Sequence, residues 1–397
     1  MALDLSVLEY FPTNYVWNLS TNIALLMGGN IGEVDTICRQ LLDASQAGDD
    51  SGTVSFFKTW CEQADRLVEL AEEDETAGCK LSASAKYGRA ATYYITAERM
   101  QNRHFEPRRH AYRLMLECFG KYIALGGLNC ERVEIPYRGT HLAALFERAH
   151  RPDGRPAPCI AFFNGLDSTK EMIFGSDIGR ELARRGISTL MVDQPGAGEA
   201  LRLQDLQAIV ESEQWAGACV DALERRPDVD QKYLGICGWS LGGFFAPRAA
   251  AFEKRFKLCV AWGANFNWGE LQKRRAQREG DRPVPHYWEH VQWVWGKDSF
   301  EEFMAFAPRI ALVDSIDKIT VPFLVTHGSN DRQIPREYAL QQYEGAINSP
   351  KRELKWFTPR EGGVEHVSAD NPGNARDYIA DWVTKTFREL GAEGLRL

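Results

Sequence analysis

The sequence has no long apolar run, and its nine cysteines show no pairing motif. No stretch reaches the roughly 18 consecutive apolar residues that a membrane-spanning helix needs, so we expect no contact with a membrane. Residues 1–4 (MALD) lack the basic region of a signal peptide, so none is expected. The cysteines occur without CxxC pairs or histidine-rich spacing. This is typical of reduced thiols in a cytoplasmic protein and argues against disulfides or a zinc site.

Long runs of like charge are also absent. The net charge is −8, and a mildly acidic chain is not expected to bind nucleic acid through its overall field. The short basic stretch at 273–275 is interpreted as a solvated helix face. With 397 residues, 44% of them hydrophobic, the chain is long enough for one large core and a second region.

Residues 1–129 lack the alternating pattern of strands. Apolar residues recur at helical spacing in four segments, which are 33–46, 54–74, 83–101 and 107–124. Polar and glycine-containing breaks separate them. We therefore predict a helical N-terminal domain or cap over 1–129.

The pattern changes at residue 130. Residues 131–146 have the signal of a β-hairpin. Short apolar strands then alternate with helices, with strands expected at 159–163, 188–193, 233–237, 258–262 and 323–327. This alternation predicts an α/β domain over 130–397, with a mostly parallel sheet covered by helices on both faces. In such sheets, ligands bind at the carboxyl ends of the strands.

One segment, 267–308, interrupts this alternation. It is helical in pattern and rich in aromatic residues. Because it falls between two core strands, we predict that it is a lid insertion over the active site.

The strongest chemical motif is GWSLG at 238–242, between an apolar strand and a helix. It fits the nucleophile elbow of the α/β-hydrolase fold, in which a tight turn exposes the hydroxyl of Ser240 at a helix N-terminus. Side chains at the two flanking glycines would clash in that turn. The alternative interpretation is a purely structural glycine-rich turn.

A serine nucleophile needs a base, and the base needs an acid that orients it. In this fold the chain order is serine, acid, histidine. Asp331 follows the strand at 321–327, and His366 follows an apolar segment and a Gly-Gly turn. We therefore predict Asp331 as the acid and His366 as the base, whereas His327 is interpreted as structural.

An oxyanion hole needs two backbone N–H groups aimed at the developing charge. Leu241, directly after the nucleophile, is expected to supply one. The loop after strand 159–163 is expected to supply the other, at Gly165 or Leu166.

Three motifs together resemble a known group of enzymes. They are NGLDSTKE at 164–171, DQPGAGE at 193–199 and GWSLGG at 238–243. The chain resembles the 2,6-dihydroxypseudooxynicotine hydrolase group, which also includes fungal hydrolases that shorten heptaketide naphthopyrones. The resemblance spans about 130–397. It implies hydrolysis of a carbon–carbon bond beside a carbonyl, in an aromatic ketone or polyketide, and a homodimer.

Several further residues are assigned roles on this basis. The group has an extra acidic residue near the nucleophile, and Glu270 is its match by position. The alternative for Glu270 is a solvated carboxylate in the first turn of a helix. Asp193 also follows a strand and is interpreted as stabilising its own turn, with a contact to the active site as the alternative. Aromatic residues are expected to form an apolar pocket for a flat substrate, and those proposed to bind it are Trp239, Trp268, Tyr287, Trp288 and Trp293.

The predicted mechanism needs no metal and no organic cofactor, and the expected partner is a small-molecule ketone or ester. Two alternatives stay open at this stage. The same triad would serve an esterase, amidase or acyltransferase. A non-catalytic ligand-binding scaffold is the other, although such scaffolds usually lack a triad member.

Overall fold

The computed structural model of the chain describes residues 8–12, 14–48, 50–277 and 282–397. It divides into two compact units. The first comprises Met1–Cys130 and Asp281–His290, and the second comprises Glu131–Gly280 and Val291–Leu397. The sequence pattern places all of 267–308 in the second domain, whereas here the short stretch 281–290 groups with the helices of the first unit.

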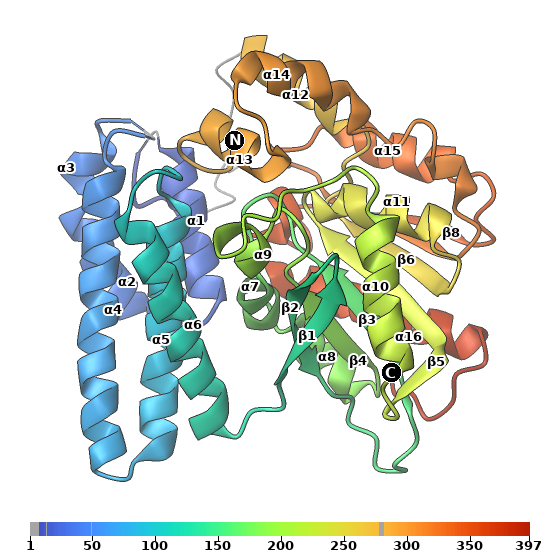
Figure 1. Cartoon of the computed structure of the whole chain (residues 1–397), viewed down its shortest axis with the longest axis horizontal. Helices are drawn as coiled ribbons and strands as arrows, with labels where there is room; N and C mark the ends of the chain where they lie inside the picture. Colours follow the sequence, from blue (N-terminus) through green and yellow to red (C-terminus); the bar gives the residue numbers. More distant parts are fainter. Residues whose placement is uncertain (1–7, 13, 49, 278–281) are drawn as a thin grey trace. The chain divides into compact units, whose positions relative to one another are not determined.

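The first unit is helical (Figure 1). Its helices are α1 (Tyr15–Leu26), α2 (Ile31–Gln40), α3 (Leu42–Ser45), α4 (Thr53–Thr76), α5 (Lys80–Arg99) and α6 (Pro107–Gly126). The predicted helix at 33–46 is two helices with a break at Leu41, and α1 adds a helix that was not predicted. Large aromatic side chains such as Trp17, Phe56 and Trp60 are fully buried between the helices.

Two hydrogen bonds attach the stretch 281–290 to this helical unit. The His286 N–H donates to the carboxylate of Asp50 at 2.8 Å. The Nε2 atom of His286 lies 3.1 Å from the hydroxyl of Thr53, at the start of α4. His286 has a positive φ of 51°, so the backbone turns sharply where these bonds form.

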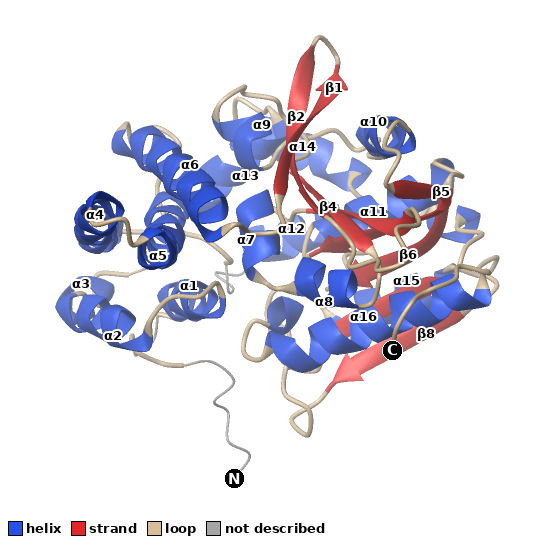
Figure 2. Ribbon diagram, turned by 90° about the horizontal axis from the view of Figure 1, so that it is seen from below, coloured by secondary structure: helices blue, strands red, loops and turns tan. Residues whose placement is uncertain are grey.

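The second unit is built on an eight-stranded sheet in the order β1-β2-β4-β3-β5-β6-β7-β8 (Figure 2). The strands are β1 (Glu131–Tyr137), β2 (Thr140–Glu147), β3 (Ala157–Phe163), β4 (Ser188–Val192), β5 (Val229–Trp239), β6 (Phe256–Trp262), β7 (Phe323–Gly328) and β8 (Arg352–Phe357). The β1–β2 and β2–β4 pairs are antiparallel, and every other pair is parallel. The predicted hairpin and the predicted α/β-hydrolase fold are confirmed.

Helices connect the parallel strands and cover the sheet on both faces. The central strands β3 and β4 are therefore buried along their whole length. They are α7 (Lys170–Gly175), α8 (Ile178–Arg184), α9 (Gly198–Arg202), α10 (Glu213–Glu224), α11 (Gly242–Phe252), α15 (Arg336–Gly345) and α16 (Pro372–Glu389). Short 3₁₀ turns lie at η1 (Ala307–Arg309), η2 (Ile316–Lys318) and η3 (His366–Ser368). Among the described residues, no helix combines the length and apolar character required to span a bilayer.

The predicted lid segment forms α12 (Trp268–Gln277), α13 (Tyr287–Trp295) and α14 (Phe300–Phe306). Residues 278–281 of it lie outside the described residues. The aromatic side chains pack on one another: Trp268 lies 5.9 Å from Trp295 and 6.0 Å from Phe303 between ring centroids. Trp295 also contacts Phe245 of α11. These contacts fix the parts of the segment that belong to the second unit; its role as a lid stays a prediction.

A buried carboxyl at the end of β2 gives a testable consequence. Burial raises the pKa of Glu147 to about 7, and the side chain lies against Gly179 of α8. The folded state therefore binds a proton more tightly than the unfolded chain, and stability falls as the pH rises from about 4.5 to about 7. Glu147→Gln should be as stable as the parent at pH 4.5 and more stable at pH 8, by roughly 3 kcal/mol at most.

The measurement is chemical denaturation at the two pH values. Glu134→Gln, at an exposed position on β1, is the matched control and should show no such pH-dependent gain. Equal stability of Glu147→Gln and the parent at pH 8 would contradict the assignment.

Candidate active site

Ser240 lies in a strained turn between β5 and α11. Its φ is 55°, in the left-handed region that non-glycine residues rarely occupy. The Ser240 N–H donates to the Trp262 carbonyl of β6 at 2.9 Å. A Cβ atom at Gly238 would overlap the Gly242 carbonyl, and a Cβ atom at Gly242 would lie 2.7 Å from the Phe163 carbonyl oxygen. Both glycines are therefore required for the close approach that exposes the serine hydroxyl.

Asp331 follows β7 and is fully buried. Its Oδ1 atom accepts N–H bonds from Gln333 at 2.8 Å and Ile334 at 2.9 Å, which fix the carboxylate plane. Burial alone would raise the pKa of Asp331, but the nearby His366, His327 and the Ile334 N–H lower the pKa to about 2. The carboxylate is therefore charged throughout the neutral range.

His366 lies in η3, in the loop that follows β8. The carboxylate of Asp370 braces this loop by accepting three backbone N–H bonds, from Gly363 at 2.9 Å, Val364 at 3.1 Å and Glu365 at 2.9 Å. The next two residues, 367 and 368, have positive φ values of 46° and 60°. The backbone around His366 is therefore sharply turned and held by hydrogen bonds, which fixes the direction of the imidazole.

These three side chains meet at the carboxyl edge of the sheet. His366 Nδ1 lies 2.9 Å from Asp331 Oδ2, and His366 Nε2 lies 2.8 Å from Ser240 Oγ. With the proton on Nδ1, the imidazole donates to the carboxylate, and Nε2 accepts from the serine hydroxyl. The arrangement allows His366 to remove the hydroxyl proton while Asp331 stabilises the resulting positive charge.

A second histidine lies behind the carboxylate. His327 is buried at the end of β7, with its Nε2 atom 3.1 Å from the Ile334 carbonyl oxygen and 3.7 Å from Asp331 Oδ2. Burial lowers the pKa of His327, which favours the neutral ring. These contacts agree with the structural role that was predicted for it.

The loop after β3 passes directly over the nucleophile. A Cβ atom at Gly165 would lie 2.9 Å from the Ser240 Cβ, so only glycine fits there. The Gly165 N–H, one of two predicted oxyanion donors from this loop, instead donates to Ser168 Oγ at 2.9 Å. Leu166 is the other predicted candidate. Leu241, the predicted donor after the nucleophile, is the N-cap residue of α11.

Ser168 was not identified from the sequence. Its hydroxyl also accepts the indole N–H of Trp239 at 3.0 Å and donates to Asn164 Oδ1 at 2.8 Å. It therefore joins the loop to the residue directly before the nucleophile. A serine in a polar loop carries no local signal of the contact with Trp239, because that contact depends on the strand order.

Several known proteins are similar to this chain in sequence and in structure. The pattern of the prolyl oligopeptidase family (Peptidase_S9) matches residues 208–388. The chain is 25% identical to 2,6-dihydropseudooxynicotine hydrolase of Paenarthrobacter nicotinovorans, over 86% of this chain and 87% of that protein. It is 29% identical to the 20-hydroxy-prefusarin hydrolase FUS2 of Gibberella moniliformis, over 91% and 93%. The crystal structure of 2,6-dihydroxy-pseudo-oxynicotine hydrolase superposes with a TM-score of 0.73 at 23% identity, covering 92% of this chain and 95% of that one.

The chain is a hydrolase with the α/β-hydrolase fold. The resemblance inferred from the three motifs is confirmed by these relatives.

Glu270 is the residue that the resemblance placed near the nucleophile. It is in the first turn of α12, its side chain is 44% exposed, and its carboxylate is 3.7 Å from Lys273 and 3.9 Å from Arg274. No contact with Ser240 or His366 is seen within the described part of the chain. This environment fits the solvated-carboxylate alternative better than a role near the nucleophile.

The aromatic residues predicted to bind substrate are not all brought together. Trp239 is half-buried beside Ser240 and makes edge contacts with Phe162 and Trp262. Trp268 is only 3% exposed and packs within the α12–α14 segment, so it serves the core of that segment. The indole of Trp293 donates to Asp205 at 3.1 Å. The other two predicted residues, Tyr287 and Trp288, belong to the first unit.

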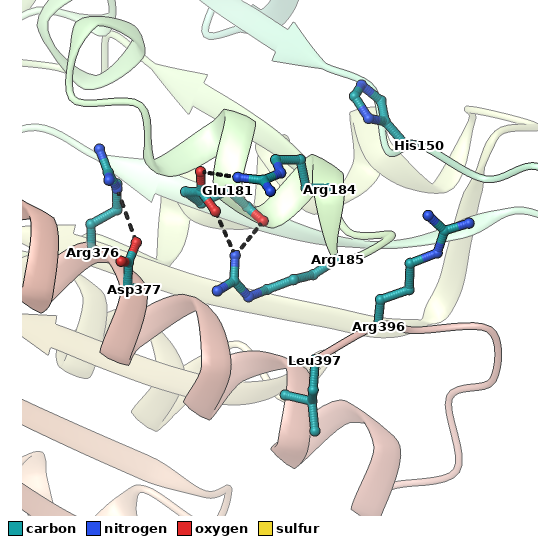
Figure 3. A pocket seen from close by; sticks show the side chains of 8 residues that line it. All are labelled: His150, Glu181, Arg184, Arg185, Arg376, Asp377, Arg396 and Leu397. Atoms are coloured by element: carbon teal, nitrogen blue, oxygen red, sulfur yellow. Dashed lines mark hydrogen bonds and ion pairs between the residues drawn. The ribbon is translucent and has the colours of Figure 1, made fainter.

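A cavity of about 740 Å³ lies elsewhere on the hydrolase (Figure 3). Its lining residues are His150, Glu181, Arg184, Arg185, Arg376, Asp377, Arg396 and Leu397. Arg184 and Arg185 both pair with Glu181, and Arg376 pairs with Asp377. Because Arg185 precedes β4, the cavity lies by the amino end of that strand, whereas Ser240 follows the carboxyl end of β5. Among the described residues, no group of His, Cys, Asp or Glu side chains is arranged to hold a metal ion.

The buried carboxylate predicts a large effect of one substitution. Asp331→Asn keeps the size of the side chain but removes the charge that selects the Nδ1–H tautomer of His366. We expect kcat to fall by about 10³–10⁴-fold with the fold retained. Steady-state turnover and circular dichroism check this result.

Asp317→Asn, on exposed 3₁₀ turn η2 of the same unit, is the matched control and should leave kcat unchanged. A folded Asp331→Asn enzyme with the parental kcat would show that another group orients the imidazole.

Proposed function

We propose that this enzyme is a serine hydrolase that cleaves a carbon–carbon bond beside a carbonyl, in an aromatic ketone or polyketide, through Ser240, His366 and Asp331. The observation that carries the proposal is the pair of hydrogen bonds joining these side chains, at 2.8 and 2.9 Å. A nucleophile, a base and an orienting acid are the complete set that acyl transfer requires.

Carbon–carbon hydrolysis is more demanding than ester hydrolysis because the leaving group is a carbanion. In a β-dicarbonyl compound or an acyl phenol, the negative charge spreads into an enolate or an aromatic ring. The departing carbon then needs only a proton donor at the moment of cleavage. An imidazolium formed at His366 in the first step supplies that proton.

The reaction proceeds in two halves. Ser240 Oγ attacks the ketone carbonyl as His366 takes the hydroxyl proton, and the N–H groups of Leu241 and Leu166 stabilise the oxyanion. The C–C bond then breaks, and its electron pair goes to the leaving carbon, which takes the proton from His366. Water, deprotonated by His366, attacks the acyl-enzyme and releases the acid and Ser240. Glu270 has no part in these steps.

Trp239 is the aromatic residue best placed to contact substrate. Its indole N–H is occupied by Ser168, so the ring offers an apolar surface next to the nucleophile. A flat aromatic ring would find a stacking partner there.

The names of the relatives support a ketonic substrate. Two enzymes that align over most of the chain are named for hydrolysis of a pseudooxynicotine and of a prefusarin. The match to the prolyl oligopeptidase family favours a second candidate, an esterase, amidase or acyltransferase that uses the same three residues on an ester or amide.

The proposed function predicts the effect of replacing the nucleophile. Ser240→Ala should fold normally and lose at least about 10⁴-fold in kcat, because no other hydroxyl occupies the position 2.8 Å from His366 Nε2. The parent enzyme should form a covalent adduct with a fluorophosphonate at Ser240, detected by peptide mass spectrometry. Ser368→Ala is the matched control, since Ser368 lies in the same 3₁₀ turn as His366 but outside the hydrogen-bonded triad.

A parent enzyme that forms no adduct at Ser240 would instead support a non-catalytic binding scaffold.

The second prediction separates the two candidate reactions. The purified enzyme should cleave an acyl-phenol or β-diketone with a kcat/KM at least about tenfold above that for a p-nitrophenyl ester of the same acyl group. Both substrates pass through the same acyl-enzyme, so the ratio reports the leaving group alone. Efficient ester cleavage with no ketone cleavage would assign the enzyme to the second candidate.

A further inference from the structure

A lysine is completely buried next to the predicted oxyanion loop. Lys170 is the first residue of α7, and its side chain has 0% exposure. Its ammonium group lies 3.0 Å from Asp193, 2.6 Å from Glu199 and 2.6 Å from Glu171. An ammonium has three N–H donors, so all three are used.

These contacts join two segments that follow neighbouring strands. The loop 164–169 follows β3, and the turn 193–199 follows β4. The backbone N–H of Lys170 also donates to Asp193 Oδ1 at 2.7 Å. At the other end of the loop, the N–H of Asn164 donates to the side chain of Gln194 at 3.0 Å, and the Gln194 amide donates back to the Asn164 carbonyl at 3.0 Å. The loop is thus attached to the same turn at both of its ends.

The turn itself is shaped around the Asp193 carboxylate. Gly198 has a φ of 45°, and a Cβ atom there would overlap the carboxyl group of Asp193. The Glu199 N–H donates to Asp193 Oδ2 at 2.9 Å. Asp193, interpreted from the sequence mainly as stabilising its own turn, also accepts the ammonium of the lysine that follows the 164–169 loop.

The cluster contains more carboxyl groups than cations. Lys170 and Arg132 face Asp193, Glu199 and Glu171, and Arg132 binds Glu199 through both of its terminal nitrogens. Glu171 is buried, and its Oε2 atom has no hydrogen-bond partner within the described residues. Burial raises the pKa of Glu171. A protonated Glu171 leaves two cations against two carboxylates.

The net contribution of such a cluster to stability is small, because the attraction between its charges is offset by their loss of hydration. Removing the charges of Lys170, Asp193 and Glu199 from water is costly, and well-packed apolar side chains often serve stability as well. What the cluster supplies is fixed geometry at the base of a loop whose Gly165 lies directly against Ser240.

We propose that Lys170 is a positioning residue, whose buried ammonium holds the 164–169 loop so that its backbone N–H groups face the oxyanion formed at Ser240. This inference rests on the serine mechanism proposed above. It adds to that mechanism a shared role for the NGLDSTKE and DQPGAGE motifs, which is to hold the 164–169 loop next to Ser240. Loss of the ammonium should weaken binding of the transition state and leave binding of the ground state nearly intact.

The test uses the full chain with a substrate that the parent enzyme turns over. Lys170→Met alone leaves the buried Asp193 carboxylate without a cation, whereas Glu199 keeps Arg132. The double variant Lys170→Met/Asp193→Asn, which removes one charge of each sign, is therefore made alongside it. We expect kcat of the folded variants to fall by about 10–100-fold, with KM changed less than about threefold. Affinity for a trifluoromethyl ketone, which forms a tetrahedral oxyanion adduct with the serine, should fall by the same factor as kcat/KM. Lys170→Arg should recover part of the loss.

Two further variants complete the experiment. Lys351→Met removes a lysine that pairs with Glu389 at the amino end of β8, and it should retain the parental kcat and inhibitor affinity. Glu171→Gln mimics the neutral acid and should keep kcat within about twofold.

Each outcome decides between the possibilities. A folded double variant with parental kcat and inhibitor affinity would overturn the proposal, as would a loss confined to thermal stability. If kcat fell as much in Glu171→Gln as in Lys170→Met, a charged Glu171 would be needed, and the balance of two cations against two carboxylates would be wrong. Absence of any Ser240-dependent turnover in the parent enzyme would reject the serine mechanism itself, before Lys170 is tested.

Discussion

The left-handed backbone at Ser240 is the constraint on which the rest of the catalytic edge depends. A residue held at a φ of 55° between a strand and a helix can project its hydroxyl beyond the sheet only if the residues two positions before and after it, and the loop packed against it, leave room. Gly238, Gly242 and Gly165 meet this requirement from two separate segments. The Ser240 N–H donates to the Trp262 carbonyl and the Gly165 N–H donates to the Ser168 hydroxyl, and these bonds hold a conformation that the isolated turn would not keep.

Much of this edge was predictable from the sequence, because its signals are local. The GWSLG turn between a strand and a helix marks the nucleophile, and chain order marks Asp331 and His366 at the ends of later strands. The alternation of strands and helices from residue 130 onward predicts the parallel sheet. Local patterns and the order of motifs along the chain can both be recognised in one sequence.

The parts that sequence reasoning missed depend on contacts across the chain. Ser168 contacts Trp239 at the end of β5, and Lys170 contacts Asp193 in the turn after β4. Both contacts depend on the sheet order, which places β3 between β4 and β5. Gly165 was a candidate oxyanion donor because of its position, but its N–H is occupied by a hydroxyl three residues on. Glu270 was placed near the nucleophile by analogy, whereas ion pairs along its own helix account for it. The aromatic residues of 267–308 were grouped by composition, although they divide between two units.

That division has a consequence for how the protein can be altered. The backbone passes from one unit to the other at three places, after residues 130, 280 and 290, and helix α13 starts in one unit and finishes in the other. A cut after Cys130 would therefore remove most of the helical unit but leave ten of its residues on the remaining fragment, where His286 would lose its bonds to Asp50 and Thr53. The two units cannot be exchanged between homologues by joining whole N- and C-terminal halves. Any recombination that preserves both must transplant residues 281–290 together with the first 130.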